Sequence, residues 1–245
     1  MSKNKKSSKN PLRWVVGIHS CREALLSHPQ WVEEVAVQDS KDQDLAEFEE
    51  LSKKKSLKFK FVGKKFLNNI AESHQGVAVA LSDRPRWVDK ASQKQRSLVV
   101  FLDGITDPHN LGAILRTAWL LEVDGIFIPK ERSVDLTPIA CKVASGGAEH
   151  VPIEPVHFGS QLDWFKKEGY WIFGLSEEGK GLLPQMNFPE KTVLIVGAED
   201  KGLRASTAKF CDELIQIPQT AGGSSYNASV AFAISAYECT RSRHL

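Results

Sequence analysis

The chain has 245 residues, of which 42% are hydrophobic, and a formal net charge of +2. This length and composition predict an ordinary globular protein with one good hydrophobic core or two modest ones. No apolar run of signal-peptide length follows the basic N-terminus, and no run of about eighteen apolar residues occurs, so a cytoplasmic protein without a membrane span is expected.

The cysteines argue against a zinc site. Cys21, Cys141, Cys211 and Cys239 are widely separated, without a Cys-x-x-Cys pair or a nearby histidine at the spacing of a tetrahedral site. We therefore expect reduced thiols in the core and no metal.

Positive charge gathers in two places despite the near-neutral total. The clustered lysines are Lys3, Lys5, Lys6 and Lys9 in an N-terminal tail without acids, and Lys53, Lys54, Lys55, Lys58, Lys60, Lys64 and Lys65 further on. Such clusters suit an anionic partner. A disordered tail and a solvated helix face explain the same composition equally well.

Strands and helices alternate after the tail. The pattern predicts a strand and a helix within residues 15–27, a strand at 32–38, an amphipathic helix at 45–55, and strands at 58–63 and 76–81. The next stretch, SDRPRWVDKASQKQRS, is polar and charged, which is typical of a linker. We accordingly expect a basic disordered tail at 1–12, a small α/β domain at 13–82, a linker at 83–96 and a second domain at 97–245.

The second domain contains near-continuous apolar runs that end at Gly or Pro. These runs are LVVFLDG, GIFIP, WIFGLS, TVLIVG and ELIQIP, and most of the intervals between them have helical patterns. Strands that are apolar on both faces predict a buried parallel sheet with helices on each side, which is an α/β fold. Ligands of such sheets bind beyond the carboxyl ends of the strands.

The first unusual strand exit is LDGITDPHNLGAILRTAWLLE, residues 102–122. Asn110 stands where the N-cap of a helix is expected, and the buried stripe of that helix is Leu111, Ile114, Leu115, Ala118 and Leu121. Arg116 falls off this stripe. A capping Asn and a surface Arg explain the pattern without a site, although the many polar residues of the loop favour one.

Two further strand exits have the same character. In LIVGAEDKGL a strand ends at Gly197 and the carboxylate of Glu199 follows, without the spacing of a dinucleotide or phosphate loop. In IQIPQTAGGSSYNASVAFAISAYE a Gly-Ser loop precedes a helix without charge from Asn227 to Tyr237. That helix is either a core helix capped by Ser225 or Asn227, or a ligand loop and helix at a dimer interface.

These three stretches resemble a known family. DPHNLGAILRTA, VGAEDKGL and IPQTAGGSSYNASVA are similar, in order and in spacing, to the signature motifs of the SpoU (TrmH-like) RNA ribose methyltransferases. GIHSCREAL and HQGVAVAL are similar to the two ends of the small RNA-binding domain that many members carry. The resemblance covers almost the whole chain.

The resemblance implies an activity, a cofactor and a fold. The family transfers a methyl group from S-adenosylmethionine to a ribose 2′-hydroxyl, and its parallel α/β domain threads the C-terminal segment into a deep trefoil knot. The implied cofactor-pocket residues are Gly197, Ile217 and Tyr226, and the residues implied around the transfer site are Asn110, Arg116, Glu199, Ser225 and Asn227. Backbone groups at strand exits can grip an adenine without special side chains.

Within the family Arg116 corresponds to the candidate for activating the hydroxyl. A guanidinium is a poor base, because its pKa is above about 12. Our hypothesis is that Arg116 holds an RNA phosphate and stabilises the developing alkoxide, while Glu199 and Asn227 orient Arg116 and the ribose. Two departures stand out: the family usually has Gly at Asp200, and commonly Leu-Asn-Val where this chain has Tyr226-Asn227-Ala228.

The expected substrate is a guanosine of 23S ribosomal RNA, because the extra small domain is most typical of those members, with transfer RNA as the alternative. The expected assembly is a homodimer in which each subunit offers one basic small domain. Two other classes stay open: a non-catalytic RNA-binding or ribosome-assembly protein, suggested by Asp200, and a generic nucleotide-binding α/β enzyme, which the missing phosphate-loop motifs disfavour.

Overall fold

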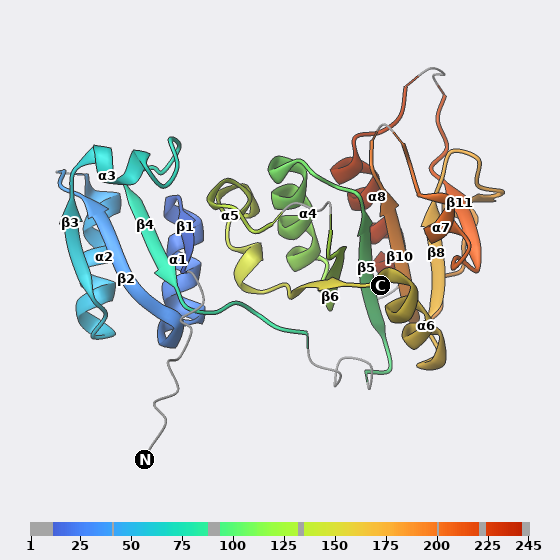
Figure 1. The fold of residues 1–245 in the computed structure, drawn as a ribbon, viewed down its shortest axis with the longest axis horizontal. Helices are drawn as coiled ribbons and strands as arrows, with labels where there is room; N and C mark the ends of the chain where they lie inside the picture. The colour runs from blue at the N-terminus through green and yellow to red at the C-terminus, as the bar shows by residue number, and fades with distance from the viewer. Residues whose placement is uncertain are drawn as a thin grey trace, which may run out of the picture.

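The computed structural model describes residues 12–40, 42–87, 94–131, 135–199, 201–220 and 224–241. Apart from Leu12, the predicted N-terminal tail lies outside these residues. So do residues 88–93 of the predicted linker, and Asp200. The described chain forms two sheets that lie side by side in Figure 1.

The small domain contains β1 (Arg13–Val16), α1 (Ile18–Ser27), η1 (Pro29–Trp31), β2 (Val32–Gln38), α2 (Gln43–Lys54), β3 (Phe59–Val62), α3 (Lys64–Asn68) and β4 (Val77–Leu81). Its sheet has the order β1-β4-β2-β3, in which β4 is antiparallel to both neighbours and β2 is parallel to β3. Successive side chains of a strand point to opposite faces. Val15 and Val79 accordingly pack with α1 and α2, whereas Val16 and Ala78 pack with Leu67 of α3.

The larger domain begins with β5 (Ser97–Asp103), α4 (Pro108–Leu120), β6 (Gly125–Pro129), α5 (Pro138–Ala144), η3 (Gly147–Glu149), β7 (Ile153–Val156) and α6 (Phe158–Lys167). It continues with β8 (Trp171–Leu175), β9 (Gly181–Leu182), η4 (Leu183–Gln185), β10 (Lys191–Gly197), α7 (Ala205–Ala208), β11 (Glu213–Gln216) and α8 (Ala228–Thr240). The strands form a seven-stranded parallel sheet of order β7-β6-β5-β10-β8-β11-β9.

Both faces of this sheet are covered, which confirms the predicted α/β fold. Leu98, Val100 and Leu102 of β5 share a core with α4, α5 and α8, whereas Val99 and Phe101 share a second core with α6. All seven residues of β5 are buried, so its apolar run without alternation is that of a central parallel strand.

β7, β9 and α3 were not predicted from the sequence. β7 is an edge strand that contains Pro155, and an edge is where a sheet tolerates a proline. β9 has two residues, too few for a periodic signal. The trefoil knot stays a prediction, because the order in which strands pair does not record how the chain threads.

The two domains share an extensive contact, in which α1 and β1 of the small domain pack against α5 and η3 (Figure 1). Buried side chains of both domains belong to one continuous apolar cluster. A bidentate ion pair joins the domains, in which Arg13 Nη1 and Nη2 donate to the two carboxylate oxygens of Glu149 at 2.8 and 2.6 Å. The Ser20 hydroxyl also donates to the Cys141 carbonyl at 2.8 Å. These contacts hold the small domain in one position beside the sheet.

Candidate active site

A cavity of about 980 Å³ opens at the carboxyl ends of β8, β10 and β11, where a parallel sheet is expected to bind its ligand. Its walls include Gly197, Ile217 and Tyr226, the three residues predicted to hold a cofactor. Glu199 and Ser225, both predicted around the transfer site, line the same cavity. One chain therefore brings these five residues together.

The loop after β10 shapes one wall of the cavity. Gly197 needs to be a glycine because a Cβ there would lie 2.2 Å from the carbonyl carbon of Gly202. The absent side chain at Gly197 therefore lets the chain's own loop pack against the end of the strand. Gly202 has a positive φ of 58° and donates its N–H to the Ala198 carbonyl at 2.8 Å, which closes the loop.

Asp103 ties this loop to the neighbouring strand, a role that sequence analysis did not find. Asp103 ends β5, is buried, and accepts from the backbone N–H of Arg204 at 3.0 Å. The Arg204 side chain also approaches it, with Nε 2.8 Å from Oδ1. The only sequence signal was an acidic residue at the end of an apolar run, which resembles an ordinary turn.

Asn110, Glu199 and Asn227 form a hydrogen-bonded cluster at the edge of the cavity. Asn110 Nδ2 donates to Glu199 Oε1 at 2.9 Å, and Asn227 Nδ2 donates to Asn110 Oδ1 at 3.0 Å and also to Glu199 Oε1. The backbone N–H of Ala228 adds a further donor at 3.3 Å. Glu199 Oε1 thus collects three donors, while Oε2 has no hydrogen bond within the described residues.

Helix capping differs from the prediction at α4 and agrees with one of two options at α8. Asp107 is the N-cap of α4, since its Oδ1 accepts from His109 N at 2.9 Å, and Pro108 takes the first helical position. The prediction that Asn110 is the cap is wrong, and its amide is directed to Glu199 instead. Asn227 caps α8, with Oδ1 accepting from Ser229 N at 2.9 Å.

Arg116 stands apart from this cluster in its own chain. It is exposed, does not line the cavity, and forms no hydrogen bond or ion pair within the described residues. Arg116 comes six positions after Asn110 in the helix, which places it about 9 Å further along the axis and about 240° around it. The predicted orientation of Arg116 by Glu199 and Asn227 is therefore not present within one chain.

Within the described residues, no group of His, Cys, Asp and Glu could hold a metal ion. Cys141 is buried, and burial raises the pKa of its thiol to about 11, which makes it a poor nucleophile. No helix in the described ranges has the length and apolar character that a membrane crossing requires.

The cavity fits S-adenosylmethionine. Its volume lies within the range of about 300–1,000 Å³ that is usual for small-molecule sites. Leu175, Val196 and Ile215, at the ends of three adjacent strands, supply apolar walls beside exposed backbone groups. The exposed ring of Tyr226 adds an aromatic surface on which an adenine could stack.

Comparison with known proteins agrees with this geometry. The SpoU rRNA Methylase family matches residues 97–237, and the RNA 2′-O ribose methyltransferase substrate binding family matches residues 14–87. The chain is 35% identical over 242 residues to a protein of Coxiella burnetii named 23S rRNA (guanosine-2′-O-)-methyltransferase RlmB. That match covers 95% of this chain and 96% of the relative.

Solved structures share the whole fold. The SpoU methyltransferase AviRb from Streptomyces viridochromogenes, solved in complex with the cofactor AdoMet, has a TM-score of 0.82 at 21% identity and covers 99% of this chain and 95% of its own. An AdoMet-bound rRNA methyltransferase from Sinorhizobium meliloti has a TM-score of 0.79 at 20% identity. That match covers 99% of this chain and 91% of the solved chain. The chain belongs to the SpoU rRNA methylase family.

Proposed function

We propose that this protein transfers a methyl group from S-adenosylmethionine to the ribose 2′-hydroxyl of a guanosine in 23S ribosomal RNA. The observation that carries the proposal is the Asn110–Glu199–Asn227 cluster at the edge of a cofactor-sized cavity. It occurs in a chain that matches a 23S rRNA guanosine methyltransferase over nearly its full length. Acting on ribosomal RNA would place the protein in the cytoplasm.

Transfer RNA is the alternative substrate. Two solved structures concern tRNA. One, on the 2-OH methylation of C/U34 on tRNA, matches 62% of this chain, and the other, a TrmH/SpoU tRNA modifying enzyme of A. aeolicus, matches 63% of this chain. The rRNA methyltransferase of Sinorhizobium meliloti covers 99%. The full-length match therefore favours ribosomal RNA.

Gly197, Ile217 and Tyr226 would hold the cofactor, largely through backbone groups and the tyrosine ring. When bound, S-adenosylmethionine supplies an electrophilic methyl group on a sulfonium. The protein's task is to hold a ribose hydroxyl in line with that methyl group, and positioning of this kind dominates such reactions.

The hydrogen-bonded cluster would position the ribose. Three donors fix Glu199 Oε1, so the carboxylate plane is set and Oε2 is left to accept a hydrogen bond from another donor of the target nucleotide. Ser225, exposed on the same cavity wall, adds a hydroxyl that can hydrogen-bond the nucleotide.

Arg116 would act on the RNA backbone. Its exposed guanidinium has no partner within the described residues, so it is available to a phosphate beside the target ribose. Because Arg116 lies away from the cluster in its own chain, this contact would be made across the proposed homodimer. There the phosphate would take the hydroxyl proton while the guanidinium stabilises the developing alkoxide. Arg116 is not itself the base, since a guanidinium stays protonated.

Part of the lysine cluster would provide the RNA-binding surface of the small domain. Lys58 and Lys60 share the single carboxylate of Glu34, at 3.0 and 2.6 Å, so their positive charge is partly neutralised. The lysines that are exposed and have no ion pair within the described residues are Lys54, Lys64 and Lys65. These three are the better candidates for phosphate contacts.

The last helix would form a homodimer interface. α8 is uncharged until Glu238, yet Val230 is 44% exposed and Tyr237 is 53% exposed. A helix that is apolar on its buried face and also on its outer face is expected to be covered by another subunit. Light scattering should give twice the monomer mass at micromolar concentration, and a monomer would refute the dimer.

The proposed function is tested by transfer of tritium from labelled S-adenosylmethionine to unmodified 23S rRNA and to tRNA. We expect label in 23S rRNA with the wild-type protein and almost none with Arg116→Ala. Arg116→Lys should recover little, because an ammonium cannot contact a phosphate with two parallel donors. Label in tRNA alone would change the substrate, and cofactor binding without transfer to any RNA would favour a non-catalytic RNA-binding protein.

A further inference from the structure

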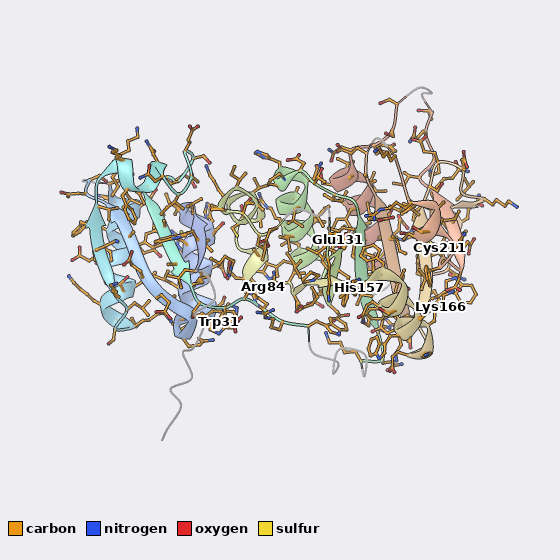
Figure 2. The ribbon with its side chains drawn as sticks, viewed as in Figure 1. Trp31, Arg84, Glu131, His157, Lys166 and Cys211 are labelled. Carbon is orange, nitrogen blue, oxygen red and sulfur yellow. The ribbon has the colours of Figure 1, made fainter. Side chains whose placement is uncertain are left out.

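A second cavity lies between the two domains, away from the cofactor cavity. It has a volume of about 680 Å³ and is formed by the start of β1, the segment that follows β4, the end of β6 and the start of α5. The charged residues that line this interdomain groove are Arg13, Asp83, Arg84, Arg86, Lys130 and Asp135. Figure 2 shows Arg84 on the segment that joins the two domains.

Two of the four cations already have partners inside the protein. Arg13 is held by both carboxylate oxygens of Glu149 at 2.8 and 2.6 Å. Arg86 Nη2 lies 3.3 Å from Asp83 Oδ1. Neither pair leaves a full positive charge directed into the groove.

Arg84 is different, because its guanidinium is half-buried and has no hydrogen bond or ion pair within the described residues. Only its backbone N–H is engaged, donating to Asp83 Oδ1 at 2.8 Å. Burial, followed by repulsion from Arg86, lowers the pKa of Arg84 despite attraction from Glu154 and Asp135. A cation kept in such a place destabilises the fold unless an anion from outside completes it.

Lys130 supplies a second available cation from the other domain. It follows β6, is exposed, and its side chain has no partner within the described residues. Arg84 lies in the segment matched by the substrate-binding family and Lys130 in the segment matched by the methylase family. A ligand held by both would contact the two domains together.

We propose that the interdomain groove binds a backbone phosphate of the RNA substrate, gripped by Arg84 with two parallel donors and supported by the charge of Lys130. The proposal rests on the proposed function for the identity of the polyanion. Phosphate geometry matches the planar guanidinium fork, whereas Lys130 contributes as a point charge. Because the domains are docked, this contact would set how far along the RNA the cofactor cavity reaches.

The first test measures RNA affinity against salt for the full-length protein and three variants. With a 23S rRNA transcript, Arg84→Met should weaken binding about tenfold, and the slope of log affinity against log salt should shrink by about 0.7–0.9 for one lost phosphate contact. Lys130→Gln should weaken binding less. Arg96→Gln is the matched control, because Arg96 is an exposed arginine, paired with Glu190, outside the groove.

Two readouts separate this role from a structural one. Removing a half-buried, unpaired guanidinium should leave the thermal midpoint unchanged or raise it. Arg84→Met should therefore have a thermal midpoint at or above the wild-type value and the wild-type affinity for S-adenosylmethionine. In methyl transfer it should raise the KM for RNA while kcat is unchanged. A lower thermal midpoint would show that Arg84 has a structural partner and would overturn the proposal.

The remaining outcomes distinguish the sources of the phosphate and the two proposals. RNA affinity and salt slope equal to those of Arg96→Gln would overturn the groove assignment. Stabilisation of the wild-type protein by inorganic phosphate below about 1 mM, absent from Arg84→Met at matched ionic strength, would identify a small-anion site instead. If wild-type protein binds RNA with an Arg84-dependent slope but transfers no methyl group, the groove stands and the proposed reaction fails.

Discussion

The ion pair between Arg13 and Glu149 should be one of the strongest single contacts in the fold. The Glu149 side chain is 1% exposed and that of Arg13 is 12% exposed, and two hydrogen bonds of 2.8 and 2.6 Å join them. Glu149→Gln keeps the size of the side chain and removes its charge, which leaves a buried guanidinium without a counter-ion. Breaking a buried pair in this way costs about 3–5 kcal/mol.

Urea unfolding followed by tryptophan fluorescence measures this cost. The matched control is Glu190→Gln, which breaks an ion pair with Arg96 whose side chains are 53% and 48% exposed, at 3.4 Å. Loss of such a surface pair costs about 0–1 kcal/mol. Arg13→Met combined with Glu149→Met should recover most of the loss, because neither residue then leaves an unpaired buried charge.

The result also tests how the domains are arranged. Glu149 belongs to the larger domain and Arg13 to the small one, so the pair is buried only while the two are docked. A loss of unfolding free energy for Glu149→Gln no larger than that for Glu190→Gln would mean that the pair is solvated in solution. The docked arrangement of the domains would then be refuted.

Three further outcomes are expected. Gly112→Ala should lower the thermal midpoint by several degrees, at about 2–4 °C per kcal/mol, because its Cβ would lie 2.7 Å from a backbone oxygen of α5. The control Gly63→Ala should leave the midpoint unchanged, because a Cβ there meets nothing within 4 Å. Burial, with two nearby lysines, lowers the pKa of His74, whose Nδ1 accepts from Gly76 N at 2.8 Å. His74 therefore binds a proton more readily in the unfolded chain than in the folded protein, so the urea midpoint should fall as the pH drops below about 6.5. The fall should be less steep in His74→Asn. Asn227→Asp should keep the helix cap but reduce methyl transfer about 100-fold, since a carboxylate repels Glu199 and cannot donate to it. Unchanged transfer in the tritium assay would show that this donor is dispensable.

Sequence alone predicted the layers of the larger domain because its signal is local. An uninterrupted run such as LVVFLDG can be buried on both faces only inside a parallel sheet, and β5 is such a strand. The stripe of α4 was equally readable, since Leu111, Ile114, Leu115 and Ala118 are all buried. Leu121, the fifth residue of the predicted stripe, is the C-cap and is only partly buried against the same core. Helical period and strand composition are properties of neighbouring residues, and no tertiary contact was needed to see them.

The strand order could not be predicted, and the geometry of the site depends on it. β10 pairs with β5, although four other strands, β6 to β9, lie between the two in the chain. Gly197 thus comes opposite Asp103. That pairing is what brings Glu199, just after β10, to Asn110, in the first turn of the helix that follows β5. A single sequence contains both residues but not their adjacency, so only the resemblance to a family placed them at one site.

Asn227 shows why the structural and the functional interpretation of a residue need not compete. Its Oδ1 is held by the backbone N–H and the hydroxyl of Ser229, at 2.9 and 2.6 Å, as in any capped helix. With the oxygen fixed there, the amide nitrogen can only point the other way, toward Asn110 and Glu199. The cap therefore also orients the side chain. Gly197 likewise has a structural and a functional role, because the absence of a side chain there lets the loop that carries Glu199 fold back against the strand end. Residues that look merely structural in this chain set the geometry in which the proposed chemistry would take place.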